Sequence, residues 1–194
     1  MLFRSAQGAE AGGHRGMFLT QDAQAQPSLM ALLPQVADAV ALPIIAAGGI
    51  ADGRAIVAAF ALGASGVQIG TAYLFTPQST ISALHRKALV ESRDDSTVLT
   101  NVFSGRPARS LQNRLMREQG PLSGKTPAFP TAGAALAPLK ALAEKAGSAD
   151  FSSLWSGQAA ALAREMDAGS LTKLLAQEAL ACLQGLAGTV RYDD

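Results

Sequence analysis

The sequence predicts an α/β fold built around a parallel sheet. Two short apolar runs, residues 43–49 and 65–71, are each followed by a segment whose apolar residues have helical spacing. Both runs are continuously apolar instead of alternating, which is typical of parallel strands buried on both faces. Glycines mark the joints between strand and helix. This order of strand, helix, strand and helix indicates repeated βα units.

The segments before the first run are less regular. The N-terminal "MLFRSAQG" lacks the pattern of a convincing buried strand, so the strand expected there is predicted to be cut short. The loop "QGAEAGGHRG" follows and contains four glycines. Further on, "SLMALLPQVADAV" places apolar residues at helical spacing, and Pro34 inside it predicts that the regular helix starts close to that residue.

The helices after the two strands have predictable ends. Asp52 is predicted to cap the first of them and Gly63 to end it. Its inward face is predicted to consist of Ile56, Ala59, Phe60 and Gly63. The second helix is predicted to start with Thr76 as its cap and Pro77 at its first position. Its inward stripe is predicted to consist of Ile81, Leu84 and Ala88.

The character of the chain changes near residue 99. Residues 101–118 are basic and polar, and residues 120–133 are rich in Gly and Pro, which predicts a long ordered loop or, alternatively, disorder. The stretch 170–188 returns to helical spacing. Its inward side is predicted to consist of Leu171, Leu174, Leu175, Cys182, Leu183 and Leu186. We therefore expect a partial (β/α) barrel region over 1–98 and a loop-rich, helical region over 99–194.

Composition argues against several classes of function. Sixteen Lys and Arg against fifteen Asp and Glu give a formal net charge of +1, and only 5% of residues are aromatic, which argues against nucleic-acid binding. No apolar run reaches the roughly 18 residues of a membrane span, and no apolar signal-peptide core is visible. The single cysteine fits a reducing compartment, so a cytoplasmic protein is expected. No residues have metal-ligand spacing, so no metal site is expected.

The glycines after the two strands predict a phosphate site. Glycine permits positive φ and lets backbone N–H groups approach a ligand closely. Two such loops side by side, each ahead of a helix, form an anion site without a lysine. In (β/α)8 barrels a cofactor phosphate often lies on the loops after the last two strands. Gly48, Gly49, Gly70 and Thr71 fit that placement, with the Thr71 hydroxyl as an extra donor; the alternative is that the glycines only form tight turns.

His14, on the glycine-rich loop, is the candidate catalytic residue. No apolar periodicity surrounds it, and a side chain that titrates near neutral pH suits an acid, a base or a hydrogen-bond donor. The alternative is a histidine on a surface loop. A charge pair between Glu10 and Arg15 is predicted to fix the loop. His85, beside two basic residues, is predicted to be exposed, and Cys182 to lie in the core.

Four stretches carry a family resemblance. "QGAEAGGHRG", "PIIAAGGIADGRAIVAAFALGASGVQIGTAYL", "SGRPAR" and "LWSGQAAALARE" together resemble the nitronate monooxygenase family, formerly called 2-nitropropane dioxygenases. The "GGHRG" form favours this family over the related flavin-dependent enoyl reductases and NADH:quinone reductases. The resemblance implies the C-terminal part of a TIM-like (β/α)8 barrel with an added helical region. It also implies non-covalent FMN, and oxidation of alkyl nitronates such as propionate 3-nitronate by dioxygen to a carbonyl compound and nitrite.

The resemblance implies roles for particular residues. His14 matches the active-site histidine of the family, which would hydrogen-bond the nitronate or remove the α-proton of a neutral nitroalkane. Gln7 and Gly12 resemble flavin contacts on the loop after the sixth strand. The positions that resemble the phosphate-binding residues of the family are Gly48, Gly49, Gln68, Ile69, Gly70 and Thr71.

The first half of the barrel, which in this family precedes the "EAGGHRG" loop, has no counterpart in the sequence. A (β/α)8 barrel has about 250 residues, and strands left without neighbours expose edges that pair with other chains. We therefore expect weak FMN binding, impaired turnover, and self-association or pairing with a missing N-terminal half. Two alternatives stay open: a flavin-dependent NAD(P)H:quinone or enoyl reductase, and a non-catalytic remnant that binds only a phosphate-bearing ligand.

Overall fold

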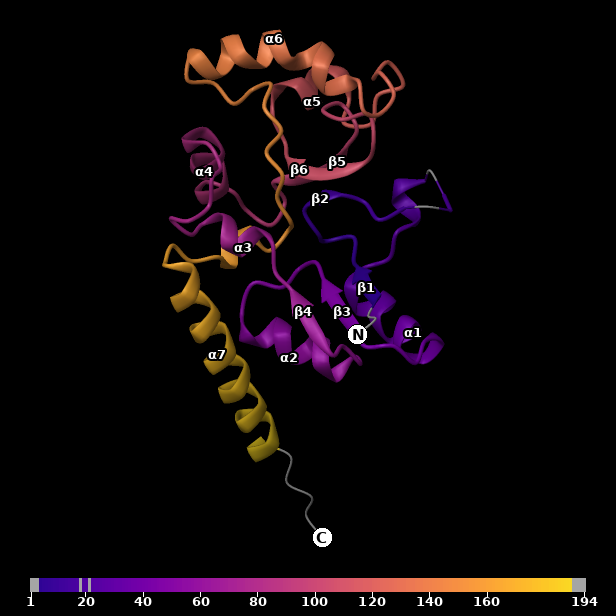
Figure 1. The fold of residues 1–194 in the computed structure, drawn as a ribbon, viewed down its shortest axis with the longest axis vertical. Coiled ribbons are helices and arrows are strands. Elements are labelled where there is room, and N and C mark those ends of the chain that lie inside the picture. The colour runs from indigo at the N-terminus through magenta and orange to yellow at the C-terminus, as the bar shows by residue number, and fades with distance from the viewer. Residues whose placement is uncertain (1–3, 18, 21, 190–194) are drawn as a thin grey trace.

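The computed structural model describes residues 4–17, 19–20 and 22–189, which form two lobes, each built on a three-stranded sheet (Figure 1). The first sheet is parallel, with the order β1-β3-β4, and the second is antiparallel, with the order β2-β6-β5. The parallel strands are β1 (Arg4–Gln7), β3 (Ile44–Ala47) and β4 (Gly66–Gln68). The antiparallel strands are β2 (Gly13–His14), β5 (Thr97–Thr100) and β6 (Ala108–Leu111).

The parallel sheet contains the two predicted βα units. Strand β3 leads into α2 (Gly53–Ala61), and β4 leads into the single turn α3 (Thr71–Leu74). Helices α1 (Leu29–Ala39) and α7 (Ala168–Thr189) complete this lobe, and α7 lies along α2 (Figure 1). A Cβ on Gly53 would come within 2.4 Å of the backbone of Glu178, so only glycine permits this close approach. The prediction of a parallel βα sheet is confirmed.

The prediction of a cut strand at the N-terminus is wrong for the described residues. Arg4 to Gln7 form a parallel strand beside β3, with Arg4 opposite Ile44 and Gln7 opposite Ala47. The short stretch has little apolar pattern of its own, but β3 supplies its hydrogen-bond partners and Ala6 is buried in the core. Tertiary pairing therefore outweighs the weak local signal. Residues 1–3 lie outside the described part of the chain.

Helix α1 starts earlier than predicted. It begins at Leu29, with the Ser28 hydroxyl accepting a hydrogen bond from the backbone N–H of Ala31, and Pro34 lies inside it. Proline removes one helical hydrogen bond. The helix nevertheless continues through it, because Leu29 and Leu33 are both buried against the sheet. The expectation that the helix starts near Pro34 is wrong for this reason.

The ends of α2 are confirmed, but two members of its predicted inward face, Phe60 and Gly63, are exposed. The Asp52 carboxylate accepts a hydrogen bond from the Ala55 N–H, and Gly63 has a φ of +100° just beyond the helix end. Ile56 and Ala59 are buried as predicted. Phe60, however, is 42% exposed, because it borders an apolar groove that no described residue fills.

Helix α4 (Ala83–Val90) is capped by Ser82, so the prediction of a cap at Thr76 is wrong. Thr76 is buried, and its hydroxyl donates to the Tyr73 carbonyl at the end of α3. The predicted inward residues of this helix are half-buried: Ile81, Leu84 and Ala88. His85 was predicted to be exposed but is only 8% exposed. It shares the inward face with Leu89, four residues on, and that face packs towards the second lobe.

The second lobe contains most of what the sequence pattern did not predict. Strand β6 lies within the basic, polar stretch and β5 directly before it, and two helices follow, α5 (Arg114–Gln119) and α6 (Ala132–Lys145). Short 3-10 turns occur at η1 (Ala23–Ala25) and η2 (Ala160–Leu162). The division of the chain at residue 98 stays a prediction.

The C-terminal helix α7 is confirmed, but only part of its predicted stripe is covered. Leu171 and Leu175 are buried, and Cys182 is half-buried against the core. Leu183 and Leu186 are 45% and 55% exposed, because α7 extends past the end of the lobe (Figure 1). Across the described ranges, no helix has both the length and the apolarity to cross a bilayer.

Candidate functional site

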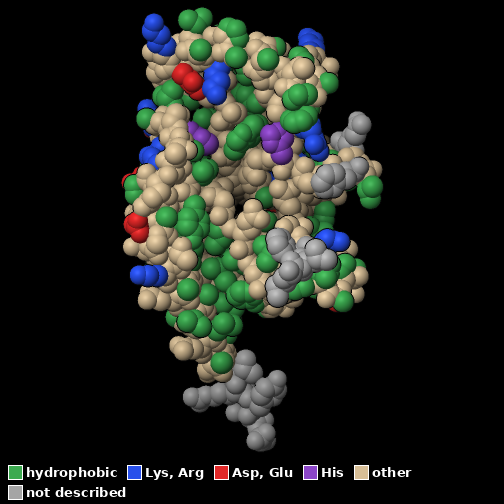
Figure 2. All heavy atoms as spheres, viewed as in Figure 1, with side chains coloured by type: hydrophobic (Ala, Val, Ile, Leu, Met, Phe, Trp, Pro, Cys, Tyr) green, Lys and Arg blue, Asp and Glu red, His purple; other side chains and the backbone are tan. Residues whose placement is uncertain are grey.

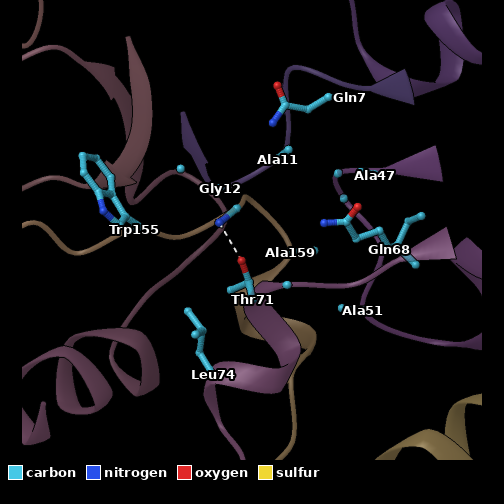
Figure 3. A pocket seen from close by; sticks show the side chains of 16 residues that line it. Gln7, Ala11, Gly12, Ala47, Ala51, Gln68, Thr71, Leu74, Trp155 and Ala159 are labelled. Carbon is cyan, nitrogen blue, oxygen red and sulfur yellow. Dashed lines mark hydrogen bonds between the residues drawn. The ribbon is translucent and has the colours of Figure 1, made fainter. Parts of the chain in front are cut away.

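A cavity of about 250 Å³ lies at the carboxyl ends of the three parallel strands, facing the second lobe (Figure 3). The space-filling view shows a hollow between the two lobes (Figure 2). This end of a parallel sheet is the usual ligand site of βα folds. The cavity is lined by seven of the residues whose type or position predicted a cofactor contact: Gln7, Gly12, Gly48, Gly49, Gln68, Gly70 and Thr71.

Two of the predicted phosphate positions need glycine for backbone reasons. Gly48 has a φ of +116° and Gly49 a φ of +70°, in the left-handed region that other residues disfavour. A Cβ on Gly48 would also meet the backbone N of Ala11 at 3.0 Å. These glycines therefore let the β3 loop turn closely against the glycine-rich loop.

Gly70 borders the cavity, and neither its conformation nor a contact with the described protein atoms requires glycine there. Its φ is −99°, and a Cβ built on it meets nothing within 4 Å. A methyl group there would enter the cavity, so the missing side chain leaves room for a ligand. We call the loop residues Gly48, Gly49, Gly70 and Thr71 the glycine cradle. Because the donors around this space are neutral backbone and side-chain groups, the glycine cradle suits a phosphate that is held without lysine. The residues present therefore fit the phosphate end of the expected FMN.

A close junction of two loops forms one wall of the cavity. A Cβ on Gly12 would lie 2.6 Å from the N of Gly157, so the loops touch backbone to backbone. The Gly157 N–H donates to Thr71 Oγ1 at 2.9 Å, the dashed line in Figure 3, and the Gln158 N–H donates to the Glu10 carbonyl at 3.0 Å. Because Thr71 Oγ1 accepts this bond, its own hydrogen is directed elsewhere. The hydroxyl can thus serve as the predicted donor to a ligand.

Gln7 ties the end of β1 to the loop that carries His14. Its Nε2 donates to the His14 carbonyl at 3.0 Å, and its Oε1 accepts from the Gly16 N–H at 2.7 Å. Both ends of the amide are therefore used to hold the loop in place. Gln7 lines the cavity and at the same time fixes the position of the candidate catalytic residue.

His14 lies on β2, at the edge of the site and outside the cavity lining. Its Nε2 is 2.7 Å from the Ser104 hydroxyl, and its ring centre is 5.4 Å from that of Trp155 and 6.2 Å from that of Phe129. Partial burial lowers the pKa of His14, and the nearby Arg106 guanidinium lowers it further. The imidazole is therefore neutral at pH 7.

A pH titration followed by NMR is expected to place the midpoint for His14 below 6.5. The variant Arg106→Gln removes the second cause and leaves burial in place, so the midpoint should move upward. Lys87→Ala, on the exposed side of α4, is the control and should leave it unchanged. A midpoint at or above 6.5 in the unaltered chain would contradict this electrostatic description.

The predicted charge pair between Glu10 and Arg15 does not form. Arg15 is buried, and it donates instead to the carbonyls of Gly8, Ala9 and Ala11. The Glu10 carboxylate accepts from the N–H of Leu29 at the start of α1. Burial lowers the pKa of Arg15 to about 10, with a further lowering by Arg109 that Glu10 opposes. The Arg15 side chain thus fixes the loop by binding the backbone carbonyls that the loop turns inward.

One residue predicted to contact the cofactor lies outside the cavity, and residues that were not predicted line it. Ile69 packs against the core and borders the apolar groove beside α2, away from the cavity. The cavity lining also contains residues that sequence reasoning did not single out: Ala11, Gly13, Ala47, Ile50, Ala51, Leu74, Trp155, Gly157 and Ala159. Trp155 is the single tryptophan and stands two residues before a glycine, which is the one signal that could have indicated it. Among the described residues, no group of three or more His, Cys, Asp or Glu could hold a metal ion.

Comparison with known families identifies the chain. The family model described as nitronate monooxygenase matches residues 5–178. The chain belongs to the nitronate monooxygenase family. A relative from Staphylococcus saprophyticus, described as "Probable nitronate monooxygenase", is 40% identical over 176 residues, which cover 90% of this chain and 50% of the relative. A relative from Staphylococcus aureus with the same description is 41% identical over 86% of this chain and 47% of its own length.

Solved structures of similar proteins agree with the family assignment. Nitroalkane oxidase from Streptomyces ansochromogenes has a TM-score of 0.86 and 41% identity, over 95% of this chain and 53% of its own. FabK from Thermotoga maritima has a TM-score of 0.74 and 29% identity, over 97% of this chain and 57% of its own. This nitronate monooxygenase family chain thus has the fold of part of a TIM-like (β/α)8 barrel with an added helical region, as predicted. It spans about half the length of the curated relatives it matches.

Proposed function

We propose that this site holds FMN and that, in a completed barrel, it oxidises alkyl nitronates with dioxygen to a carbonyl compound and nitrite. The observation that carries the proposal is the convergence of separate segments on one cavity. Residues after β1, β3 and β4 line it together with the 155–159 segment, and Gln7 ties the His14 loop to it. Family membership and the likeness to nitroalkane oxidase support the same chemistry.

The phosphate end of FMN is assigned to the glycine cradle. Backbone groups of Gly48, Gly49 and Gly70 approach that space, and Thr71 offers a hydroxyl hydrogen. Gln68 borders the same cavity from the end of β4. When bound, the flavin supplies the capacity to accept electrons from the nitronate and to pass them to dioxygen. The protein supplies position and electrostatics.

His14 is assigned to the reacting end of the nitronate. Ser104 occupies Nε2, so Nδ1 is the ring nitrogen left for a ligand among the described contacts. The lowered pKa keeps the ring neutral at pH 7, so it can donate a hydrogen bond to nitronate oxygens or accept an α-proton from a neutral nitroalkane. Because the His14 ring is neutral, it does not form a tight ion pair with the anionic nitronate.

Replacing His14 tests the proposal. In the FMN-loaded protein, His14→Ala is expected to lower kcat/KM for nitrite release from propionate 3-nitronate roughly 100-fold or more, as for loss of a positioned acid–base group. His14→Ala should retain as much FMN as the unaltered protein, because His14 lies outside the cavity lining. Lys87→Ala is the matched surface control. Equal nitrite release by His14→Ala and the unaltered protein would refute the role.

The two alternatives have distinct signatures. Steady NAD(P)H consumption with a quinone or enoyl thioester acceptor, without nitrite, would select the flavin-dependent reductase. Loss of FMN on desalting, with binding of inorganic phosphate retained, would select a non-catalytic remnant. The convergence of the His14 loop and the cradle favours the nitronate reaction, since the remnant requires only the cradle.

We also propose that the open edges of the parallel sheet pair with a polypeptide that completes the barrel. Among the described strands, β1 and β4 each pair only with β3. Beside β4, an apolar groove of about 500 Å³ runs between α2 and α7, and it is bordered by the exposed side chains of Phe60, Leu180 and Leu183. Apolar side chains gather over these two helices in Figure 2. The occupant proposed is the half of the fold that the match to the relatives leaves uncovered; self-association is the other outcome of the test.

A cytoplasmic location is proposed as well. Cys182 is the only cysteine, and it is half-buried against the core without a partner for an internal disulfide. A reducing compartment suits such a chain. Cell fractionation tests this assignment.

A further inference from the structure

His85 is a buried titratable residue that the proposed reaction does not use. It lies on α4, is 8% exposed, and its Nε2 is 3.1 Å from the Trp155 carbonyl. A carbonyl only accepts, so Nε2 carries the proton and donates. Burial lowers the pKa of His85, which keeps the ring neutral. A neutral buried ring with one directed bond is suited to hold a backbone segment in place.

The segment that His85 holds connects both lobes at the site. Leu154 accepts from the N–H of Leu111 in β6, and the Ser156 N–H donates to the Arg109 carbonyl of the same strand. On the other side, the Gly157 N–H reaches Thr71 of the first lobe. The His85 bond falls between these anchors, on the carbonyl of Trp155 itself.

The Trp155 indole lies directly beside His14. Its ring centre lies 5.4 Å from that of His14, with the planes inclined by 51°, and 5.8 Å from that of Phe103, with the planes at 89°. The indole is therefore held between a core aromatic ring and the candidate catalytic imidazole. Moving the Trp155 backbone would move one wall of the space that His14 occupies.

We propose that His85 is a positioning residue that orients His14 through Trp155. The bond from His85 Nε2 fixes the Trp155 peptide, the fixed peptide sets the position of the indole, and the indole lies beside the His14 imidazole. This coupling between His85 and His14 is a property of the folded chain and needs no bound ligand. Its consequence for turnover rests on the proposed function, because that is where His14 acts.

Two substitutions at His85 separate the hydrogen bond from simple packing. His85→Leu introduces an apolar side chain of similar size and removes the donor, whereas His85→Gln keeps an N–H donor at similar reach. Trp155 is the only tryptophan, so fluorescence excited at the indole band reports on this residue alone. NMR of the imidazole protons of His14 reports on the ring current of the neighbouring indole.

The chain of residues 1–194, without flavin or nitronate, is used for both measurements. His85→Leu should shift the Trp155 emission, lower its anisotropy and move the His14 proton resonances, and His85→Gln should restore all three. A purely structural role would lower Tm in His85→Leu while leaving Trp155 emission and the His14 resonances as in the unaltered chain. That result would overturn the proposal.

A second variant covers the case in which His85→Leu does not fold. Trp155→Ala removes the indole while leaving the carbonyl that accepts from His85, so the His14 resonances should move; unchanged resonances would overturn the proposal. In the FMN-loaded protein, His85→Leu should lower kcat for nitrite release with FMN retention unchanged. Absence of nitrite from the unaltered protein would count against the proposed function, while the optical and NMR results would still decide the coupling.

Discussion

Adding the half of the fold that the relatives have beyond their match to this chain is expected to convert weak FMN binding by the chain into stoichiometric retention. The chain by itself offers the phosphate cradle and the His14 loop, but it matches only 53% of the nitroalkane oxidase structure. Among the described strands, β1 and β4 each pair on one side only, so no further strand of the described chain adds a wall to the cavity. Closing the open edges adds contacts and excludes water. We expect FMN to bind roughly 100-fold tighter, which corresponds to about 2.7 kcal/mol.

The experiment is co-expression of this chain with the part of the Staphylococcus saprophyticus relative that it does not match. The purified material is incubated with excess FMN and desalted, and its visible absorbance is recorded. Co-purification with a shifted flavin spectrum supports the proposal. Leu180→Glu introduces a charge at a 61% exposed position beside the groove, so it should block pairing without unfolding the chain.

Three outcomes would contradict the expectation. If the chain alone retains stoichiometric flavin and elutes as a monomer, the site needs no completion. If the chain alone retains flavin only as a dimer, a second copy of the chain provides the further contacts. The proposal that the other half of the fold pairs with the open sheet edges is then wrong. A colourless mixture that co-purifies would show pairing without a rebuilt flavin site.

The part of the fold that the sequence predicted is the part governed by local periodicity. Residues 43–71 have continuous apolar runs, an Asp cap and glycine joints, all of which act over a few residues, and the structure has β3, α2 and β4 there. Strand β1 was predicted to be cut short because its stability comes from pairing with β3, about forty residues away along the chain, and not from its own pattern. Strands β5 and β6 were missed because they mix polar and apolar residues without alternation, although both are largely buried by the folded second lobe.

The candidate site shows the same division. The glycines after the strands predicted the glycine cradle, because backbone that approaches closely or has a positive φ requires glycine, and glycine is visible in the sequence. The neighbours of His14 left no such mark. Ser104, Phe129 and Trp155 reach it from the second lobe, and only the fold brings them together. His85 was misjudged because two basic sequence neighbours indicate a solvent face, while the helix turns His85 itself inward.

Replacing Gly12 by Ala is expected to have a large effect on stability, because it opens the junction between the two loops. The new Cβ would lie 2.6 Å from the N of Gly157 and 2.7 Å from the carbonyl carbon of Ser156, so backbone must move on one side or the other. Overpacking of this kind costs about 1–3 kcal/mol. Separation of the loops would also weaken the bonds from Gln158 to Glu10 and from Gly157 to Thr71, at about 1 kcal/mol each.

Gly70→Ala is the matched substitution, because it affects the cradle without affecting the junction. Its Cβ meets nothing within 4 Å, and a φ of −99° is open to alanine, so the free energy of unfolding should change by less than about 0.5 kcal/mol. The methyl group would nevertheless occupy ligand space. Urea unfolding and FMN titration of the co-expressed complex therefore separate two roles of glycine at one site. Gly12→Ala should lose both stability and FMN, and Gly70→Ala should lose FMN alone; unchanged FMN affinity in Gly70→Ala would place the phosphate away from the β4 loop.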